Sequence, residues 1–250
     1  MMNPIKPILA LLAFVAAPAT AAEINLWCPP ALRGFMAEMV PPFETASGHK
    51  LVMRFEVMPV MKRQMDAGAA FDVAILTADL MDQAIAQGRF VPATRAVIAR
   101  TGAGLAVAKG AAKPDIGSIA AFKQTLLKAK SIGYTADGAT GNAVLAMLER
   151  IGVASELKRK LKPYPGGGAV MAAARGEVEM TITTIPGILD ASGTDLVGPL
   201  PSELQSYVVF TAAVGAQARD AAAARSFLAF LTGPAAASVL KAKGLDLPPL

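Results

Sequence analysis

The sequence predicts a two-lobed α/β protein in which each lobe is a doubly wound, mainly parallel sheet flanked by helices. Three observations support this fold class. A removable leader precedes the folded part, strand-like and helix-like segments then alternate in two successive series, and no low-complexity linker separates the two series. Alternating strands and helices build parallel sheets through right-handed crossovers, and two such series make two lobes.

The first 22 residues have the organisation of a secretory signal peptide. Lys6 is followed by the apolar stretch 8–17 and by a small-residue run that ends at Ala22. This apolar stretch is too short to span a bilayer, and a small-residue end is typical of a cleavage site. We therefore expect residues 1–22 to be removed and the mature chain to be periplasmic.

The first series contains three strand-helix units. Its predicted strands are residues 23–28, 51–57 and 71–76, and its helices are expected to end at Gly48, by Gly68 and at Gly88. The last of these strands is a continuous apolar run, as a parallel strand covered on both faces requires. Asp79 is positioned to cap the third helix.

The second series begins after a less regular stretch. Strands are predicted at residues 104–108, 131–135, 178–184 and 207–214, and two Ala-rich helices, 219–231 and 234–243, close the chain. Ser118 is expected to cap a helix between the first two of these strands. We predict that residues 23–103 plus 207–250 form lobe I and that residues 104–206 form lobe II.

Composition argues against several functional classes. The formal net charge of +5 comes from dispersed basic residues that no aromatic side chains accompany, so nucleic-acid binding has little support. A single cysteine, Cys28, excludes an internal disulfide. His, Cys, Asp and Glu show no metal-ligand spacing, so neither a metal nor a cofactor is expected, and we expect a monomer.

Ligands of doubly wound sheets bind outside the carboxyl ends of the strands, where helices begin. The loops that follow Trp27, Val57, Leu76, Thr135, Pro163 and Thr184 are therefore the candidate binding loops. Thr140-Gly141 and Gly166-Gly167 can offer backbone amides at helix starts to an anion. Of the adjacent Thr183 and Thr184, alternation along a strand predicts that one hydroxyl faces the cleft and the other faces away.

Three ordered segments resemble one known family. They are CPPAL at residues 28–32, QMDAGAAFDVAI at residues 64–75 and FLAFLTGPAAA at residues 227–237. Together they resemble the periplasmic molybdate-binding proteins of ABC importers over essentially the whole mature chain. The resemblance implies a type II periplasmic binding fold, hinge strands near residues 104–108 and 207–214, closure on a small anion, a membrane permease as partner and no catalytic residues.

In that family, serine hydroxyls, a tyrosine and backbone amides hold the oxyanion. The serine positions fall here near Ala31 and near Met58 or Pro59, and the tyrosine position falls near Thr184, so backbone donors carry most of the expected contacts. The predicted ligand-binding residues are Pro30, Ala31, Met58, Pro59, Thr77, Thr140, Gly141, Gly166, Gly167 and Thr184.

Other ligands and activities stay open at this stage. A larger organic carboxylate could use an apolar wall of Trp27, Pro29, Pro30 and Met58, with Arg33 or Arg63 as its ionic partner. Met58, Met61 and Met65 near Cys28 have the chemistry of a copper(I) site, although this spacing is more often core packing.

Two further functional classes compete with transport. An exported enzyme on the same scaffold would depend on Cys28 as its nucleophile, and the distant His49 makes a poor base for it. A sensing role without transport is the third possibility.

Overall fold

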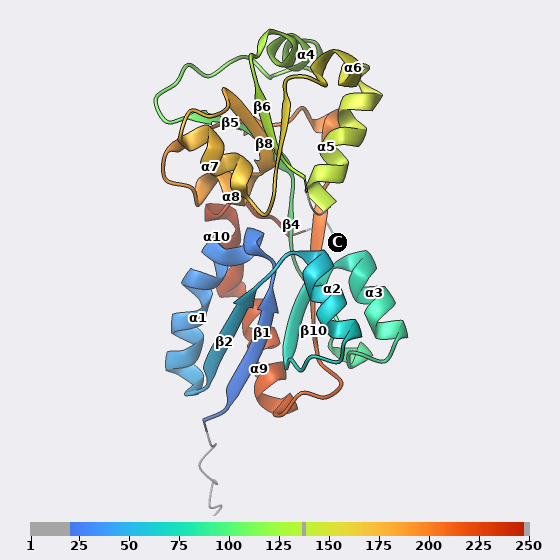
Figure 1. Ribbon diagram of the computed structural model, residues 1–250. Coiled ribbons are helices and arrows are strands. Elements are labelled where there is room, and N and C mark those ends of the chain that lie inside the picture. Colours follow the sequence, from blue (N-terminus) through green and yellow to red (C-terminus); the bar gives the residue numbers. More distant parts are fainter. Residues whose placement is uncertain (1–20, 137–138, 248–250) are drawn as a thin grey trace, which may run out of the picture.

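The computed structural model describes residues 21–136 and 139–247, so residues 1–20 of the predicted signal peptide lie outside it. Two five-stranded sheets form two lobes stacked end to end, with β4 and β10 running toward the junction between them (Figure 1). Both sheets carry helices on both faces. The two-lobed, mainly parallel α/β architecture is therefore confirmed.

The first sheet has the strand order β2-β1-β3-β10-β4. Its strands are β1 (Glu23–Cys28), β2 (Lys50–Phe55), β3 (Val73–Thr77), β4 (Ala96–Thr101) and β10 (Val208–Val214). β1 pairs in parallel with β2 and β3, whereas β10 pairs antiparallel with β3 and β4. The C-terminal part of the chain thus completes the sheet that the N-terminal part begins.

Helices cover both faces of this first sheet. They are α1 (Arg33–Ser47), α2 (Met58–Asp66), α3 (Ala78–Ala86), α9 (Ala221–Leu231) and α10 (Pro234–Ala242), with the short 3-10 turns η1 (Pro30–Leu32) and η2 (Pro92–Thr94). Alternate side chains of β1 enter two cores on opposite faces of the sheet. Leu26 packs with α1, α9 and α10, and Trp27 packs with α2 and α3. This alternation is the period of two that a strand imposes on its side chains.

The second sheet repeats the plan, with the order β7-β6-β8-β5-β9. Its strands are β5 (Ala103–Ala108), β6 (Ile132–Thr135), β7 (Leu161–Tyr164), β8 (Met180–Thr184) and β9 (Thr194–Pro199). Its helices are α4 (Ile119–Lys128), α5 (Ala139–Arg150), α6 (Ala154–Leu157), α7 (Gly168–Ala174) and α8 (Ile185–Leu189), and η3 (Ser202–Leu204) follows β9. β5 is antiparallel to both of its neighbours, as β10 is in the first sheet.

The chain crosses between the sheets twice. Gly102 alone separates β4 from β5, and residues 200–207 return the chain from β9 to β10. Gln205 joins the two crossings, because its Oε1 accepts from the Ala103 amide at 3.0 Å and its Nε2 donates to the Ala103 carbonyl at 2.8 Å. The crossings therefore lie side by side, which is the arrangement expected of a hinge.

Three strands escaped the sequence prediction: β4, β7 and β9. Each lies at the edge of its sheet. β7 and β9 have mostly half-exposed or exposed residues, and Pro163 and Pro199 lie within them. Edge strands tolerate proline and need no continuous apolar run, so periodicity gives them little signal.

Helix-end chemistry was predicted with mixed success. Gly48 ends α1 with a φ of 74°, and the Ser118 hydroxyl accepts from the Ala121 amide at the start of α4, so both predictions are confirmed. The prediction that Asp79 caps α3 is wrong. Thr77 occupies the capping position and Asp79 lies inside the first turn, because the chain becomes helical directly after β3.

Within residues 21–136 and 139–247, no single helix combines the length and the apolar composition needed to cross a membrane. α9 and α10 pass that test only as a pair, and they are bent by 60° at the break between them.

Candidate functional site

A cleft of about 320 Å³ lies between the two lobes. This volume is at the lower end of the range for small-molecule sites. One group of lining residues is apolar and forms the walls: Pro29, Pro30, Ala31, Val57, Met58, Val170, Met171, Ala191, Val208 and Phe210. The remaining residues supply polar groups and glycine backbone: Arg33, Thr77, Thr135, Thr140, Gly166, Gly167, Thr183, Thr184, Gly187 and Asp190.

Six helices begin at this cleft, three from each lobe. The residues that mark their starts in the lining are Arg33 of α1, Met58 of α2, Thr77 before α3, Thr140 of α5, Gly167 before α7 and Thr184 before α8. Each helix start presents backbone N–H groups and the positive end of a helix dipole. The cleft is therefore electrostatically suited to an anion.

The structure brings most of the predicted ligand-binding residues together. Eight of the ten line this cleft: Pro30, Ala31, Met58, Thr77, Thr140, Gly166, Gly167 and Thr184. Pro30 and Thr184, which are 154 positions apart in the chain, meet there because both sheets turn the carboxyl ends of their parallel strands toward the junction. The strand-end rule applied to the sequence thus selected loops that meet at this cleft.

Pro59 and Gly141 are the two predicted residues that do not line the cleft. Pro59 follows Met58 on α2, and its side chain is exposed. Gly141 is buried, and a Cβ built on it would overlap the Thr135 carbonyl oxygen. Its role in the structure is to let α5 start directly against the end of β6.

Thr183 and Thr184 both line the cleft, and their hydroxyls make different contacts. Thr183 follows the alternation of β8, and its Oγ1 lies 3.3 Å from the Oγ1 of Thr135 on the neighbouring strand. Thr184 is the residue at which the chain leaves the strand, and its Oγ1 accepts from the Gly187 amide to cap α8. Alternation ends where the helix begins.

The charged side chains in the lining are Arg33 from lobe I and Asp190 from lobe II. The guanidinium carbon of Arg33 lies 4.0 Å from the centre of the Phe55 ring, so its cation stacks on the last residue of β2. Asp190 follows the end of α8, and its Oδ2 accepts from the Gly34 amide at 3.0 Å. Arg63, the second arginine predicted as a carboxylate partner, is exposed on α2 and does not line the cleft.

Comparisons with known proteins agree with this arrangement. Residues 24–246 match the family described as bacterial extracellular solute-binding protein. The chain belongs to this family. The prediction of a resemblance to molybdate-binding proteins is also confirmed, because a molybdate-binding protein of Azotobacter vinelandii is 26% identical over 93% of each chain.

Two more similarities bear on the fold and the ligand of this solute-binding protein. The solved structure of the periplasmic molybdate-binding protein of A. vinelandii has a TM-score of 0.77 at 20% identity, covering 90% of this chain and 100% of that one. It confirms the type II periplasmic binding fold. An aconitate isomerase of a Pseudomonas species is 27% identical over 98% of this chain and 97% of its own length.

Several lining residues of this solute-binding protein were missed by sequence reasoning. Val57 and Thr135 directly precede loops that the strand-end rule selected, so a broader window around each strand end would have included them. Asp190, Met171 and Phe210 lie at the end of α8, inside α7 and within β10. No strand-end signal marks these three, and only the docking of the two lobes places them in the cleft.

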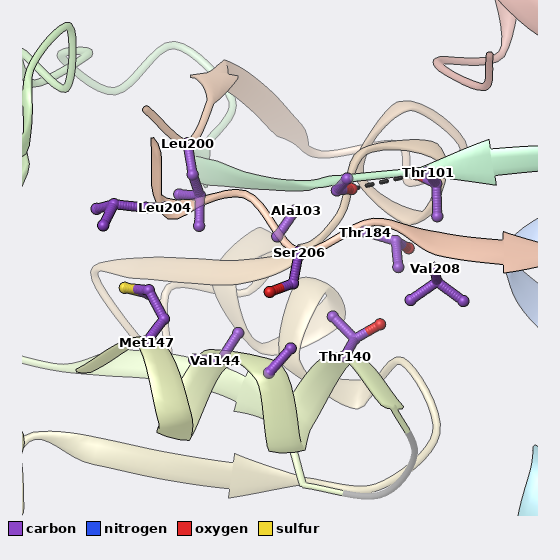
Figure 2. Close-up of a pocket in the computed structure, with 12 residues that line it drawn as sticks. Thr101, Ala103, Thr140, Val144, Met147, Thr184, Leu200, Leu204, Ser206 and Val208 are labelled. Carbon is purple, nitrogen blue, oxygen red and sulfur yellow. Dashed lines mark hydrogen bonds between the residues drawn. The ribbon is translucent and has the colours of Figure 1, made fainter. Parts of the chain in front are cut away.

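A smaller pocket of about 10 Å³ adjoins the cleft at the hinge and shares Thr140, Thr184 and Val208 with it. Figure 2 shows Ser206 on the second crossing lying above α5, with Val144 and Met147 facing it. This pocket extends the cleft toward the two crossings. Gly102 of the first crossing and Ser206 of the second both line this pocket.

The proposed copper(I) site is contradicted by the faces on which its residues lie. Met61 and Met65 are buried on the Trp27 side of the first sheet, whereas Cys28 is buried on the opposite side with Leu26. Within the described part of the chain, no three His, Cys, Asp or Glu side chains gather as metal ligands. Met58 packs against both cores and lines the cleft.

Cys28 is part of the core and does not line the cleft. Burial raises the pKa of its thiol far above the ordinary value, and the nearby Arg33 opposes that shift only in part. Because the thiolate is the reactive form, we expect no reaction of the native protein with Ellman's reagent at pH 8 and one reactive thiol per chain in urea. Rapid native labelling would contradict the buried assignment.

Proposed function

We propose that this solute-binding protein acts in the periplasm, captures a small organic carboxylate between its lobes and delivers it to the membrane permease of an ABC importer. The observation that carries the proposal is that one cleft combines helix N-termini with apolar walls. Helix N-termini from both lobes favour negative charge, and apolar walls favour a carbon skeleton. An organic anion has both of these properties, whereas an inorganic oxyanion has only the charge.

The lining residues at the expected hydroxyl positions support the same ligand class. By the resemblance, the serine positions of the molybdate-binding family fall near Ala31 and near Met58 or Pro59, and none of these three side chains can donate a hydrogen bond. Each hydrogen bond to a charged partner contributes about 1.5 to 3 kcal/mol. Two missing donors would weaken the binding of a tetrahedral oxyanion by roughly a hundredfold or more, while a methyl group and a thioether favour contact with carbon.

The aconitate isomerase and the molybdate-binding protein are named for different anions. Aconitate is an unsaturated tricarboxylate with a six-carbon skeleton, and the isomerase named for it matches this chain over nearly its full length. Molybdate is a compact dianion. The cleft of about 320 Å³ has room for the larger of the two.

A thermal-shift screen tests the proposal. We expect cis-aconitate, tricarballylate or citrate at a hundred times its dissociation constant to stabilise the mature protein by about 2.7 kcal/mol. For a chain of this size that corresponds to a rise in Tm of roughly 5 to 11 °C. Molybdate, tungstate and sulfate at equal concentration should give little shift. A shift with an oxyanion alone would refute the carboxylate assignment.

Arg33 and Arg63 form a matched pair for this screen. Both are exposed arginines on helices of lobe I, but Arg33 begins α1 and lines the cleft, whereas Arg63 lies in the last turn of α2 and does not line it. We expect Arg33→Gln to weaken carboxylate binding about tenfold or more, the equivalent of one charge-assisted hydrogen bond. Arg63→Gln should bind as the wild type does, as measured by isothermal titration calorimetry. Equal effects of both substitutions would indicate a general charge effect.

The aconitate isomerase relative also favours a second candidate function, isomerisation of the bound carboxylate. Moving a carbon-carbon double bond requires a group that removes a proton from one carbon and returns it to another, and Asp190 is a carboxylate in the lining. Proton NMR of cis-aconitate incubated with the protein tests this candidate. Formation of trans-aconitate that is lost in Asp190→Asn would support it, and binding without conversion would favour transport.

A further inference from the structure

The carboxylate of Asp190 crosses the cleft to the opposite lobe. Asp190 follows α8 of lobe II, and its Oδ2 accepts at 3.0 Å from the amide of Gly34, a residue of the first turn of α1 in lobe I. A Cβ built on Gly34 would overlap the carboxylate, so the two groups are in direct contact. An anion supplied by the protein itself therefore occupies the N-terminus of α1.

A second contact fixes α8 against lobe I. A Cβ on Gly244, which follows α10, would come within 2.6 Å of Ile185 and 2.9 Å of Leu189. Figure 1 shows α8 directly above the ends of α1 and α10. The position of Asp190 thus rests on the packing of its whole helix and not on a single hydrogen bond.

The effect of this internal carboxylate depends on the shape of the ligand. In a compact tetrahedral dianion the negative charge is spread over all the outer oxygens. Such a ligand at the α1 end of the cleft is therefore repelled by the carboxylate of Asp190. A longer organic anion can direct its carboxylates to the helix starts at Thr77, Thr140 or Gly167 and leave neutral carbon or a hydroxyl donor beside Asp190.

We propose that Asp190 is a specificity-determining residue of the cleft. Its carboxylate excludes compact oxyanions from the N-terminus of α1 and so restricts the ligand to organic carboxylates. This inference rests on the proposed function and deepens it, because it names a group in this cleft that would distinguish a compact oxyanion from an organic carboxylate.

The experiment replaces Asp190 by asparagine, which removes the charge and keeps an oxygen that can accept from the Gly34 amide. The matched control is Asp195→Asn. Asp195 belongs to the same lobe and its Oδ2 accepts from the Gly110 amide at 2.8 Å, but it does not line the cleft. Isothermal titration calorimetry measures molybdate and tricarballylate binding to the wild type and to both variants.

We expect Asp190→Asn to bind molybdate at least tenfold more tightly than the wild type and to shift the ratio of molybdate affinity to tricarballylate affinity by at least tenfold in favour of molybdate. Asp195→Asn should change neither affinity. The inference is overturned if Asp190→Asn gains no molybdate affinity, if it gains equally for both anions, or if the wild type already binds molybdate as tightly as the variant. Asp190→Ser, which also removes the charge, replaces the asparagine variant if that variant fails to fold.

The wild-type titration separates the two proposals. If the wild type binds no carboxylate while Asp190→Asn still gains molybdate affinity, the proposed ligand class is wrong and the exclusion by Asp190 stands. If the wild type binds tricarballylate while Asp190→Asn stays inert to molybdate, the carboxylate function stands and the role of Asp190 is refuted.

Discussion

Replacing Asp72 by alanine should lower the free energy of unfolding by about 3 kcal/mol, because a buried carboxylate with several charge-assisted hydrogen bonds is lost. Asp72 is 2% exposed. Its Oδ2 accepts from the Asn25 amide at 2.7 Å, and its Oδ1 accepts from the Arg219 amide at 2.7 Å. One side chain thus ties the start of β3 to β1 and to the segment after β10.

The backbone donors, more than the ion pair, should account for that loss. The Arg219 side chain is 58% exposed and reaches Asp72 Oδ2 at 3.3 Å, so Arg219→Ala should cost less than about 1 kcal/mol. Asp72→Ala leaves the amides of Asn25 and Arg219 without this acceptor. Urea unfolding followed by circular dichroism measures both variants, and equal losses would show that the ion pair dominates. For Asp72→Ala we expect a fall in Tm of roughly 6 to 12 °C.

Replacing Gly141 by alanine should damage both stability and ligand binding. The added Cβ would overlap the Thr135 carbonyl oxygen and lie 3.2 Å from the carbonyl carbon of Ala136, and neither backbone atom can move freely at the end of β6. We expect a cost of about 1 to 3 kcal/mol, as for other overpacked sites. The first turn of α5 carries Thr140 into the cleft, so its displacement should also weaken carboxylate binding about tenfold or more.

Gly117→Ala is the matched control for this prediction. Its nearest contact would be Asp115 Oδ1 at 3.4 Å, an ordinary van der Waals distance. Urea titration and calorimetry should show this variant within about 0.5 kcal/mol of the wild type and with unchanged ligand affinity. If Gly141→Ala were as stable as Gly117→Ala and bound ligand as well, glycine would not be needed at the contact between α5 and β6.

The sequence alone was enough to predict the central elements of both lobes. The apolar run of β3 and the helical spacing that follows it are local properties, as are the caps at Gly48 and Ser118. Local chemistry also marked where strands end and helices begin. Since parallel strands bring those ends to one edge, the sequence predicts that the loops at Ala31, Met58, Thr140 and Thr184 lie near one another.

Only the tertiary structure decided which side chains complete the cleft. β4, β7 and β9 are edge strands whose places depend on pairing with distant segments, and β7 and β9 also have little apolar signal. Asp190 is the clearest example of a lining residue that the sequence does not predict. Its sequence neighbourhood is an ordinary helix end, and it meets Gly34, 156 residues away, because α8 docks on the opposite lobe. Periodicity records which face of an element is buried, whereas a contact between lobes depends on the packing of the whole chain.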